Sequence, residues 1–221
     1  MRVNRTRMHQ VWDRMKKSTD IRGLYAITQD IADSNHLIDS VGQALAGGVR
    51  ILQYRNKSGD AALRLSQARA LQSLCKQWGA LFLINDDIPL AACLQADGVH
   101  LGREDGAIAA ARAQLGARAI IGASCYNDIE LARQARAAGA DYVAFGAMFA
   151  SATKPGALHS PLAILGQARA LGLPVVAIGG ITPGNASEVI AAGADAIAVI
   201  NGIFAASDPG HAARSLSRLF S

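Results

Sequence analysis

The sequence predicts an α/β protein of the (β/α)8 barrel class, the TIM barrel, folded as a single domain. Three observations support this class: eight short apolar runs, alanine-rich stretches with helical spacing between them, and a recurring Ala-Asp step before several runs. A length of 221 residues suits one such domain. The alternative is a doubly wound open sheet. The barrel is favoured because the runs number eight and no GxGxxG motif follows the first.

Each apolar run is expected to be a parallel strand that is covered on both faces, because its apolar residues are continuous rather than alternating. In chain order the strands are predicted at 23–28, 49–55, 80–85, 98–102, 119–124, 142–146, 174–179 and 196–201. The stretches between them are predicted to be helices, for example 62–78 and 128–139. Functional groups of such a barrel lie at the carboxyl ends of its strands, so the polar residues there are the candidates.

A weak internal repeat accompanies the strands. It reads ADGVHLG at 96–102, ADYVAFG at 140–146 and ADAIAVI at 194–200. Gly139 and Gly193 precede two of these segments, as helix C-caps that lead into a strand do. The repeat therefore indicates one βα unit used several times.

Charge is concentrated at one end of the chain. Residues 1–22 contain seven Lys or Arg and two Asp, which accounts for the whole net charge of +5. We therefore expect a basic N-terminal extension over 1–22, solvated or arising from a misplaced start site, and a catalytic barrel over 23–221. Nothing else suggests nucleic-acid binding. No apolar run reaches the length of a membrane span and no signal-peptide pattern is found, so we expect no membrane association and a cytoplasmic protein.

The three cysteines do not have the spacing of a metal site. Cys75, Cys93 and Cys125 are expected to be reduced thiols, with Cys75 and Cys93 on helices and buried in the protein core. Cys125 ends a strand beside Ser124, but no histidine base accompanies it in a recognisable arrangement, which argues against a nucleophile.

A pair of acids is the most informative feature of the predicted rim. Asp86 ends the run LFLIND, and Asp105 closes the segment DGVHLGRED after the next strand. With Asn85 they offer oxygen ligands that suit Mg2+, which takes only one or two carboxylates when its partner is a phosphate. The alternative is helix capping by either acid. Asp87 fits the cap role better, with Pro89 entering the helix behind it.

Basic and hydroxyl groups follow other strands. Gln53 and Arg55 point the same way from the second strand, with Lys57 on the loop, which suits a phosphate or pyrophosphate. The alternative is that both basic residues are solvated loop charges. Ser124 ends the fifth strand, and the long loop after the sixth carries Lys154 among hydroxyls. His100, alone in an apolar strand, is expected to be a hydrogen-bonded core residue rather than a ligand.

The last two strands predict a second anion site. Gly179 and Gly180 let the backbone approach a ligand, and Pro183 suits the first turn of a helix. The eighth strand ends in Ile200 and Asn201, and the loops after strands seven and eight form the common phosphate site of this fold. Ordinary tight turns are the alternative. Two anion sites, one with a metal, indicate two phosphorylated substrates or one bisphosphate.

Taken together, these motifs closely resemble the thiamine-phosphate synthase family, also called thiamine-phosphate pyrophosphorylase. The resemblance spans about residues 23–205 and rests on LYAIT, GGVRILQYRNK, LINDDIPLA, ADGVHLGRED, IIGASCYN, GADYVAFGAMFASATKPG, PVVAIGGITPGNA and GADAIAVINGIF. It implies a transferase of thiamine biosynthesis. Such an enzyme joins 4-amino-2-methyl-5-hydroxymethylpyrimidine diphosphate to 4-methyl-5-(2-phosphooxyethyl)thiazole by dissociative chemistry, giving thiamine phosphate and pyrophosphate.

The resemblance also implies roles for residues. Asp86 and Asp105 would hold Mg2+ as the cofactor, and Arg55, Lys57, Ser124 and Lys154 would be catalytic. The substrate-binding set would be Gln53, Tyr54, Arg55, Asn56, Lys57, Asn85, Ser124, Ser151, Ala152, Thr153, Lys154, Gly180, Ile200 and Asn201. The partners would be the two substrates, and a homo-oligomer is compatible with the sequence.

Five positions depart from the family pattern. Asn56 stands where the family often has Glu, Arg103 where it has Gln, Ala150-Ser151 where it has Pro-Thr, and Asn201 where it has Ser. Three rivals remain: a thiazole tautomerase of the same fold, a sugar-phosphate isomerase or epimerase barrel, and a non-enzymatic binding barrel. The diphosphate-and-metal set argues against the first, and the lack of a paired acid and base argues against the second.

Overall fold

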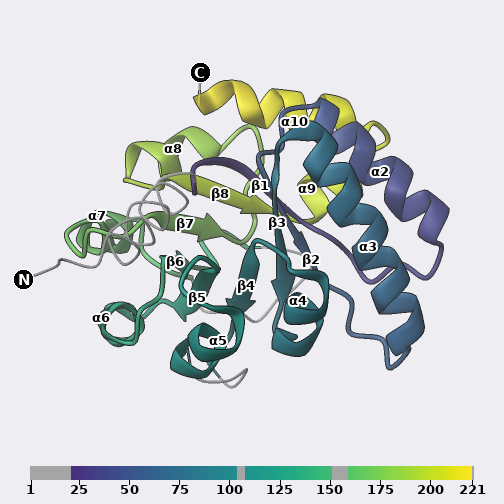
Figure 1. Ribbon diagram of the computed structural model, residues 1–221. Helices are drawn as coiled ribbons and strands as arrows, with labels where there is room; N and C mark the ends of the chain where they lie inside the picture. Colours follow the sequence, from purple (N-terminus) through teal and green to yellow (C-terminus); the bar gives the residue numbers. More distant parts are fainter. Residues whose placement is uncertain (1–20, 104–107, 151–158, 221) are drawn as a thin grey trace, which may run out of the picture.

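A computed structural model describes residues 21–103, 108–150 and 159–220 of the chain. Eight parallel strands form a closed barrel in the order β1 to β8, and β1 pairs with β8 to complete it. Figure 1 shows the helices arranged around the outside of these strands. The strands are β1 Gly23–Ile27, β2 Ile51–Tyr54, β3 Leu81–Asn85, β4 Gly98–Leu101, β5 Ile120–Tyr126, β6 Tyr142–Phe145, β7 Val175–Ile178 and β8 Ala196–Val199.

The predicted barrel is confirmed, with changes at the strand ends. Most strands are one to three residues shorter than predicted, because residues at the ends of the runs, such as Thr28, Arg55 and Gly179, lie outside the strands. The fifth strand instead extends to Tyr126, past an irregularity in its pairing with β6. The helices are α2 Ser34–Ala46, α3 Ala61–Trp78, α4 Ile88–Leu94, α5 Ile108–Leu115, α6 Ile129–Ala137, α7 Ala163–Arg169, α8 Ala186–Ala191, α9 Asn201–Phe204 and α10 Pro209–Ser217, followed by the 3-10 turn η1 Arg218–Phe220.

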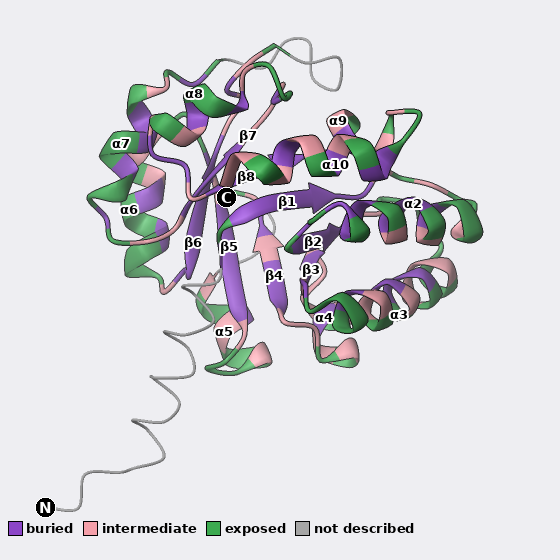
Figure 2. Cartoon of the chain, turned by 90° about the horizontal axis from the view of Figure 1, so that it is seen from above, coloured by how far each residue is buried: buried purple, intermediate pink, exposed green. Residues whose placement is uncertain are grey.

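The core has two layers, separated by the strands. Side chains of one parity point into the barrel, where Tyr25, Leu83, Tyr142 and Val176 belong to the inner cluster. Side chains of the other parity pack outward against the helices, in a larger cluster that includes Phe82. Figure 2 shows the result, with buried strands at the centre and helices that expose their outer faces. This double burial explains why the strand sequences are continuously apolar.

The repeated Ala-Asp step has a structural purpose. In each repeat the aspartate precedes an even-numbered strand and accepts a hydrogen bond from a backbone N–H at the start of the preceding strand. Asp97 accepts from Phe82 N at 3.0 Å, Asp141 from Ile121 N at 2.8 Å, and Asp195 from Val175 N at 2.8 Å. These side chains therefore join pairs of strands at the N-terminal end of the barrel.

Aspartates also start many helices. Asp87 accepts from Leu90 N as the N-cap of α4, as predicted, and Asp128 accepts from Glu130 N at the start of α6. The role predicted for Pro183 is wrong, because α8 begins only at Ala186 and Pro183 lies in the turn before it.

The cysteines divide differently from the prediction. Cys75 is buried in α3, whereas Cys93 is exposed, because the short helix α4 turns that position away from the barrel. In the parts of the chain described, no helix has the length and apolar character needed to cross a membrane.

Candidate active site

The loop after β2 is held in place by Asp30, which follows β1. One carboxylate oxygen of Asp30 lies 3.0 Å from the guanidinium of Arg55, and the other accepts from the backbone N–H of Lys57 at 2.8 Å. Thr28 is buried, and its hydroxyl both accepts from Arg55 N and donates to Arg55 O, each at 2.9 Å. Arg55 is thus held at the rim by residues that follow β1, whereas only the backbone of Lys57 is held and its side chain is 58% exposed.

The segment QYRNK splits into two sets of side chains. Gln53 is buried inside the barrel, and Arg55 follows it at the rim. The hydroxyl of Tyr54 instead donates to Gln67 on α3 at 2.9 Å, and Asn56 donates to the same Gln67 oxygen at 3.0 Å. Burial raises the pKa of Tyr54 to about 12, so its hydroxyl keeps its proton. Tyr54 and Asn56 therefore anchor the loop to α3.

Asp86 occupies the predicted place at the carboxyl end of β3. Its backbone is in the left-handed region, with φ at 63°, a conformation that Asp tolerates better than most residues and that often marks functional sites. Asn85 donates to its carboxylate at 2.5 Å, and the ammonium of Lys57 lies 3.5 Å from the same oxygen. The side chain of Asp86 is 26% exposed, so it is accessible from the rim.

This group of side chains fits Mg2+. A carboxylate that is partly open to solvent, beside an amide, supplies the hard oxygen ligand that Mg2+ uses together with substrate phosphates. The second predicted ligand, Asp105, lies outside the described residues. Within residues 21–103, 108–150 and 159–220, no group of three or more His, Cys, Asp or Glu side chains could form a metal site.

Polar side chains continue from the rim into the barrel. Gln53 donates to the hydroxyl of Tyr25 at 2.7 Å, and the Tyr25 and Tyr142 hydroxyls lie 2.9 Å apart. His100 lies between Tyr142 and Ser124, with its Nδ1 2.9 Å from one hydroxyl and its Nε2 2.8 Å from the other. The expectation of a hydrogen-bonded His100 is confirmed. Ser124 is the last side chain of this hydrogen-bonded series, near the carboxyl end of its strand.

The loops after β6 and β7 are packed tightly against each other. A side chain at Gly179 would come within 2.6 Å of Ala147, and one at Gly180 within 2.5 Å of the Ala150 carbonyl oxygen. Both glycines have positive φ, and Asn185 donates to the Gly180 carbonyl at 3.0 Å. Their glycine character is thus required by contact between the two loops.

The rim is closed by a contact between its first and last strands. Gln29, after β1, donates to the side-chain oxygen of Asn201, after β8, at 2.8 Å. Asn201 follows Ile200, which precedes the short helix α9. The predicted residues Ser151, Ala152, Thr153 and Lys154 lie outside the described residues.

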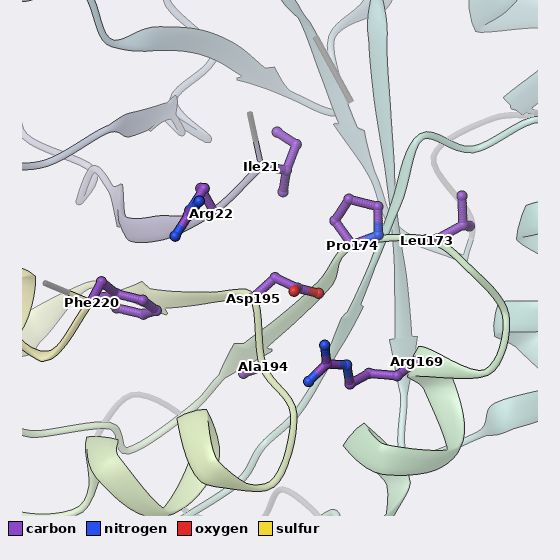
Figure 3. A pocket seen from close by; sticks show the side chains of 8 residues that line it. All are labelled: Ile21, Arg22, Arg169, Leu173, Pro174, Ala194, Asp195 and Phe220. Atoms are coloured by element: carbon purple, nitrogen blue, oxygen red, sulfur yellow. The ribbon is translucent and has the colours of Figure 1, made fainter. Parts of the chain in front are cut away.

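Two other features do not contribute to the rim. Burial raises the pKa of Cys125 to about 12, so this thiol is a poor nucleophile, in agreement with the sequence analysis. A hollow of about 530 Å³ lies at the opposite end of the barrel. Figure 3 shows side chains that line it, among them Arg22, Pro174, Asp195 and Phe220.

Comparison with known proteins gives the family. A family model described as thiamine monophosphate synthase matches residues 24–203. The chain belongs to this family. It is 60% identical over 200 residues to the thiamine-phosphate synthase of Chromobacterium violaceum, covering 90% of this chain and 97% of that relative. It is also 56% identical over 201 residues to the thiamine-phosphate synthase of an Azoarcus species, covering 90% and 98% respectively.

Solved structures agree with this membership. The thiamine phosphate pyrophosphorylase from Pyrococcus furiosus superposes with a TM-score of 0.81 at 35% identity, over 90% of this chain and 96% of that one. Orotidine 5'-phosphate decarboxylase from Pyrococcus horikoshii, at 16% identity and a TM-score of 0.65, shares the fold alone. The resemblance found in the sequence is therefore confirmed for the family and for the barrel.

Several residues that hold the candidate site in place were not found by sequence analysis. Asp30 and Thr28, which hold the Arg55 loop, look like ordinary loop residues after a strand. Tyr25 and Tyr142 are aromatic residues in apolar runs, a pattern that core packing explains equally well. The glycine in IIGAS was a usable signal, because glycine within a strand marks a close approach.

Proposed function

We propose that this chain is a transferase that joins 4-amino-2-methyl-5-hydroxymethylpyrimidine diphosphate to 4-methyl-5-(2-phosphooxyethyl)thiazole. The products are thiamine phosphate and pyrophosphate. Family membership supports the reaction, and one observation in this chain carries the proposal: Asp30 holds Arg55 and the Lys57 loop at the rim beside Asp86. That arrangement suits a diphosphate leaving group.

The diphosphate would bind on the β2 and β3 side of the rim. Arg55 and Lys57 would contact its oxygens, with Asn85 and Ser124 as further hydrogen-bond partners. In the reaction the C–O bond to the pyrimidine methylene breaks, and its electron pair leaves with the diphosphate. Arg55, held by Asp30, and Lys57 beside it would stabilise that developing charge, and electrostatic stabilisation by groups already in place is usually the largest contribution to catalysis. Lys154 would join them.

Mg2+ would be held by Asp86 together with Asp105. When bound, it neutralises charge on the departing diphosphate, as divalent cations do in phosphate chemistry. The side chains of this chain keep the metal ligand in place, since Asn85 donates to the carboxylate of Asp86 and Lys57 lies beside it.

The thiazole phosphate would bind on the β6 to β8 side. Gly180, Ile200 and Asn201 surround the loops where this fold commonly holds a phosphate, and Ser151 and Thr153 would complete the set. Asn201 is fixed by Gln29 and can still donate through its amide nitrogen. The thiazole nitrogen then attacks the methylene cation. No proton is released in that step, so the reaction requires no general base.

The wider setting follows from the same proposal. Residues 23–221 would be the catalytic barrel and residues 1–22 a basic extension with no catalytic group. Its partners would be the two small-molecule substrates, with no nucleic acid, and the free thiols support the cytoplasm as the compartment. A homo-oligomer is compatible with this function.

The direct test mixes purified protein with the pyrimidine diphosphate, the thiazole phosphate and Mg2+. We expect thiamine phosphate and pyrophosphate in equal amounts, with both abolished by EDTA and restored by added Mg2+. Binding of the thiazole phosphate without product would contradict the proposal and favour a tautomerase or a binding protein. Turnover that survives EDTA would contradict the requirement for Mg2+.

A further inference from the structure

A chain of five polar side chains crosses the interior of the barrel. It runs from Gln53 on β2 through Tyr25 on β1, Tyr142 on β6 and His100 on β4 to Ser124 on β5, with each successive pair of polar atoms within 2.9 Å. Tyr25 and Tyr142 are 1% and 0% exposed. Buried polar groups must be hydrogen-bonded, so these hydroxyls depend on one another.

The barrel is built to contain this chain. A side chain at Gly122 would lie 2.0 Å from the ring of Tyr142, so only glycine leaves room for that phenol. Tyr142 also stacks on His100, with ring centroids 5.6 Å apart, and meets Tyr25 edge to face at 6.2 Å. Burial raises the pKa of both tyrosines well above the usual range, so each hydroxyl carries one proton.

Counting protons gives the chain a direction. Gln53 donates its amide N–H to the oxygen of Tyr25, so the single proton of Tyr25 is directed to the oxygen of Tyr142. Tyr142 then donates to Nδ1 of His100, whose remaining proton lies on Nε2 and points to Ser124. In the reverse direction the buried hydroxyl of Tyr25 would donate to nothing, and an unsatisfied buried donor is costly.

We propose that this directed chain makes the hydroxyl of Ser124 a donor toward the rim. Ser124 accepts from His100, so its own proton is available for an acceptor atom of a bound molecule. The acceptor would belong to the pyrimidine diphosphate, and this assignment rests on the proposed function. Tyr25, Tyr142 and His100 are then positioning residues: they orient a catalytic hydroxyl from inside the barrel and do not touch the reacting atoms.

The first test reads the histidine directly. Long-range ¹H–¹⁵N NMR at about pH 8, above the ordinary imidazole pKa, reports which ring nitrogen of His100 carries the proton. The H100N variant provides the assignment. We expect Nε2 to be protonated and Nδ1 to be bare in the wild type. A proton on Nδ1 would overturn the proposal, whether or not the protein makes thiamine phosphate.

Variants show which hydroxyl sets the tautomer. Tyr142→Phe removes the donor to Nδ1, so we expect the preference for Nε2–H to weaken. Tyr54→Phe is the matched control for this readout, because it also deletes a buried tyrosine hydroxyl but one that bonds to Gln67 on α3. An equal effect of both variants would contradict the proposal. If Tyr142→Phe does not fold, Tyr25→Phe replaces it in this test, because it removes the preceding hydroxyl of the same chain.

Kinetics test the consequence at the rim. Tyr142→Phe and Ser124→Ala should each lower kcat/KM for the pyrimidine diphosphate about tenfold, the usual effect of one lost hydrogen bond to a charged or oriented partner. The KM for the thiazole phosphate should not change. The double variant should lose little more than either single variant, because both break one chain. Additive losses, or an equal change in the thiazole KM, would overturn the positioning role.

Discussion

The two ends of the barrel use aspartate in opposite ways. At the C-terminal rim, Asp30 and Asp86 face the cationic side chains of Arg55 and Lys57 and are partly exposed. At the N-terminal end, the three aspartates of the Ala-Asp repeat accept from backbone N–H groups of a neighbouring strand. Asp141 also pairs with Arg112, and Asp30 also accepts from a backbone N–H, so the kind of partner alone does not separate the two ends. The difference is that the rim aspartates are partly exposed beside basic side chains, whereas those of the repeat tie one strand to the next.

The largest effect is expected at Asp86. Replacing it by alanine removes a proposed metal ligand, so Mg2+-dependent turnover should fall about 10²- to 10³-fold, as for loss of a key electrostatic group. Steady-state kinetics and thiazole phosphate binding would be measured together, and binding should be largely intact. The neighbour provides the control: Asp87→Ala removes the cap of α4 and should cost about 1 kcal/mol of stability with little loss of activity.

Asp141→Ala should show the opposite behaviour. Asp141 is 3% exposed and accepts from both Ile121 N and Arg112, so its loss leaves a partly buried guanidinium without its counter-charge. The free energy of unfolding should fall by about 3 kcal/mol, typical of a broken buried pair. Urea denaturation measures this change. Activity well below the unfolding transition should stay within about twofold of wild type, and a large specific loss of turnover would break the comparison.

Asp195→Ala should have a smaller effect of the same kind. Asp195 is only partly buried and accepts from Val175 N at 2.8 Å, whereas Asp141 also pairs with the guanidinium of Arg112. The unfolding free energy should fall by about 1 to 2 kcal/mol, the usual cost of a lost hydrogen bond to a charged group. An equal loss of unfolding free energy in Asp195→Ala and Asp141→Ala would mean that the ion pair with Arg112 adds nothing to stability.

Asp30→Ala tests the rim indirectly. Its carboxylate orients Arg55 and the backbone of Lys57, so we expect KM for the pyrimidine diphosphate to rise about tenfold. KM for the thiazole phosphate should stay constant, which product assays with one substrate varied at a time will show. A change confined to thermal stability would mean that Asp30 belongs with the aspartates of the N-terminal end.

The smallest effect is expected from deleting residues 1–20. The described chain begins at Ile21, which belongs to the inner cluster and lines the hollow at the N-terminal end, far along the strands from the rim. Turnover should therefore stay close to wild type. A large loss in the product assay would show that the extension reaches the rim or an interface between copies of the chain.

Sequence alone predicted the order and number of strands, because continuous apolar runs bounded by glycine and polar residues leave few alternatives. It also placed Asp86 and Arg55 correctly, since the carboxyl ends of parallel strands share one edge. It could not predict which tyrosines face inward. Tyr25, Tyr54 and Tyr142 all lie in apolar runs. The sequence indicates which face of the strand such a side chain is on only when a polar neighbour, such as Gln53, identifies the interior face.

The failures have related physical causes. Cys93 was expected in the core, but a helix as short as α4 has no clear apolar stripe to orient it. The role of Asp30 depends on a contact with β2 that spans 25 residues, and the Gln29 contact with Asn201 spans 172. Local patterns contain no information about such distant pairs, which only the closure of the barrel brings together.

That closure has a consequence for synthesis on the ribosome. β1 pairs with β8, Tyr25 with Tyr142, and Gln29 with Asn201. In each pair, one partner is synthesised early in translation and the other much later. Such long-range contacts slow folding. The catalytic rim therefore cannot assemble until almost the whole chain has emerged, and a prematurely terminated chain that lacks β8 would be inactive as well as incomplete.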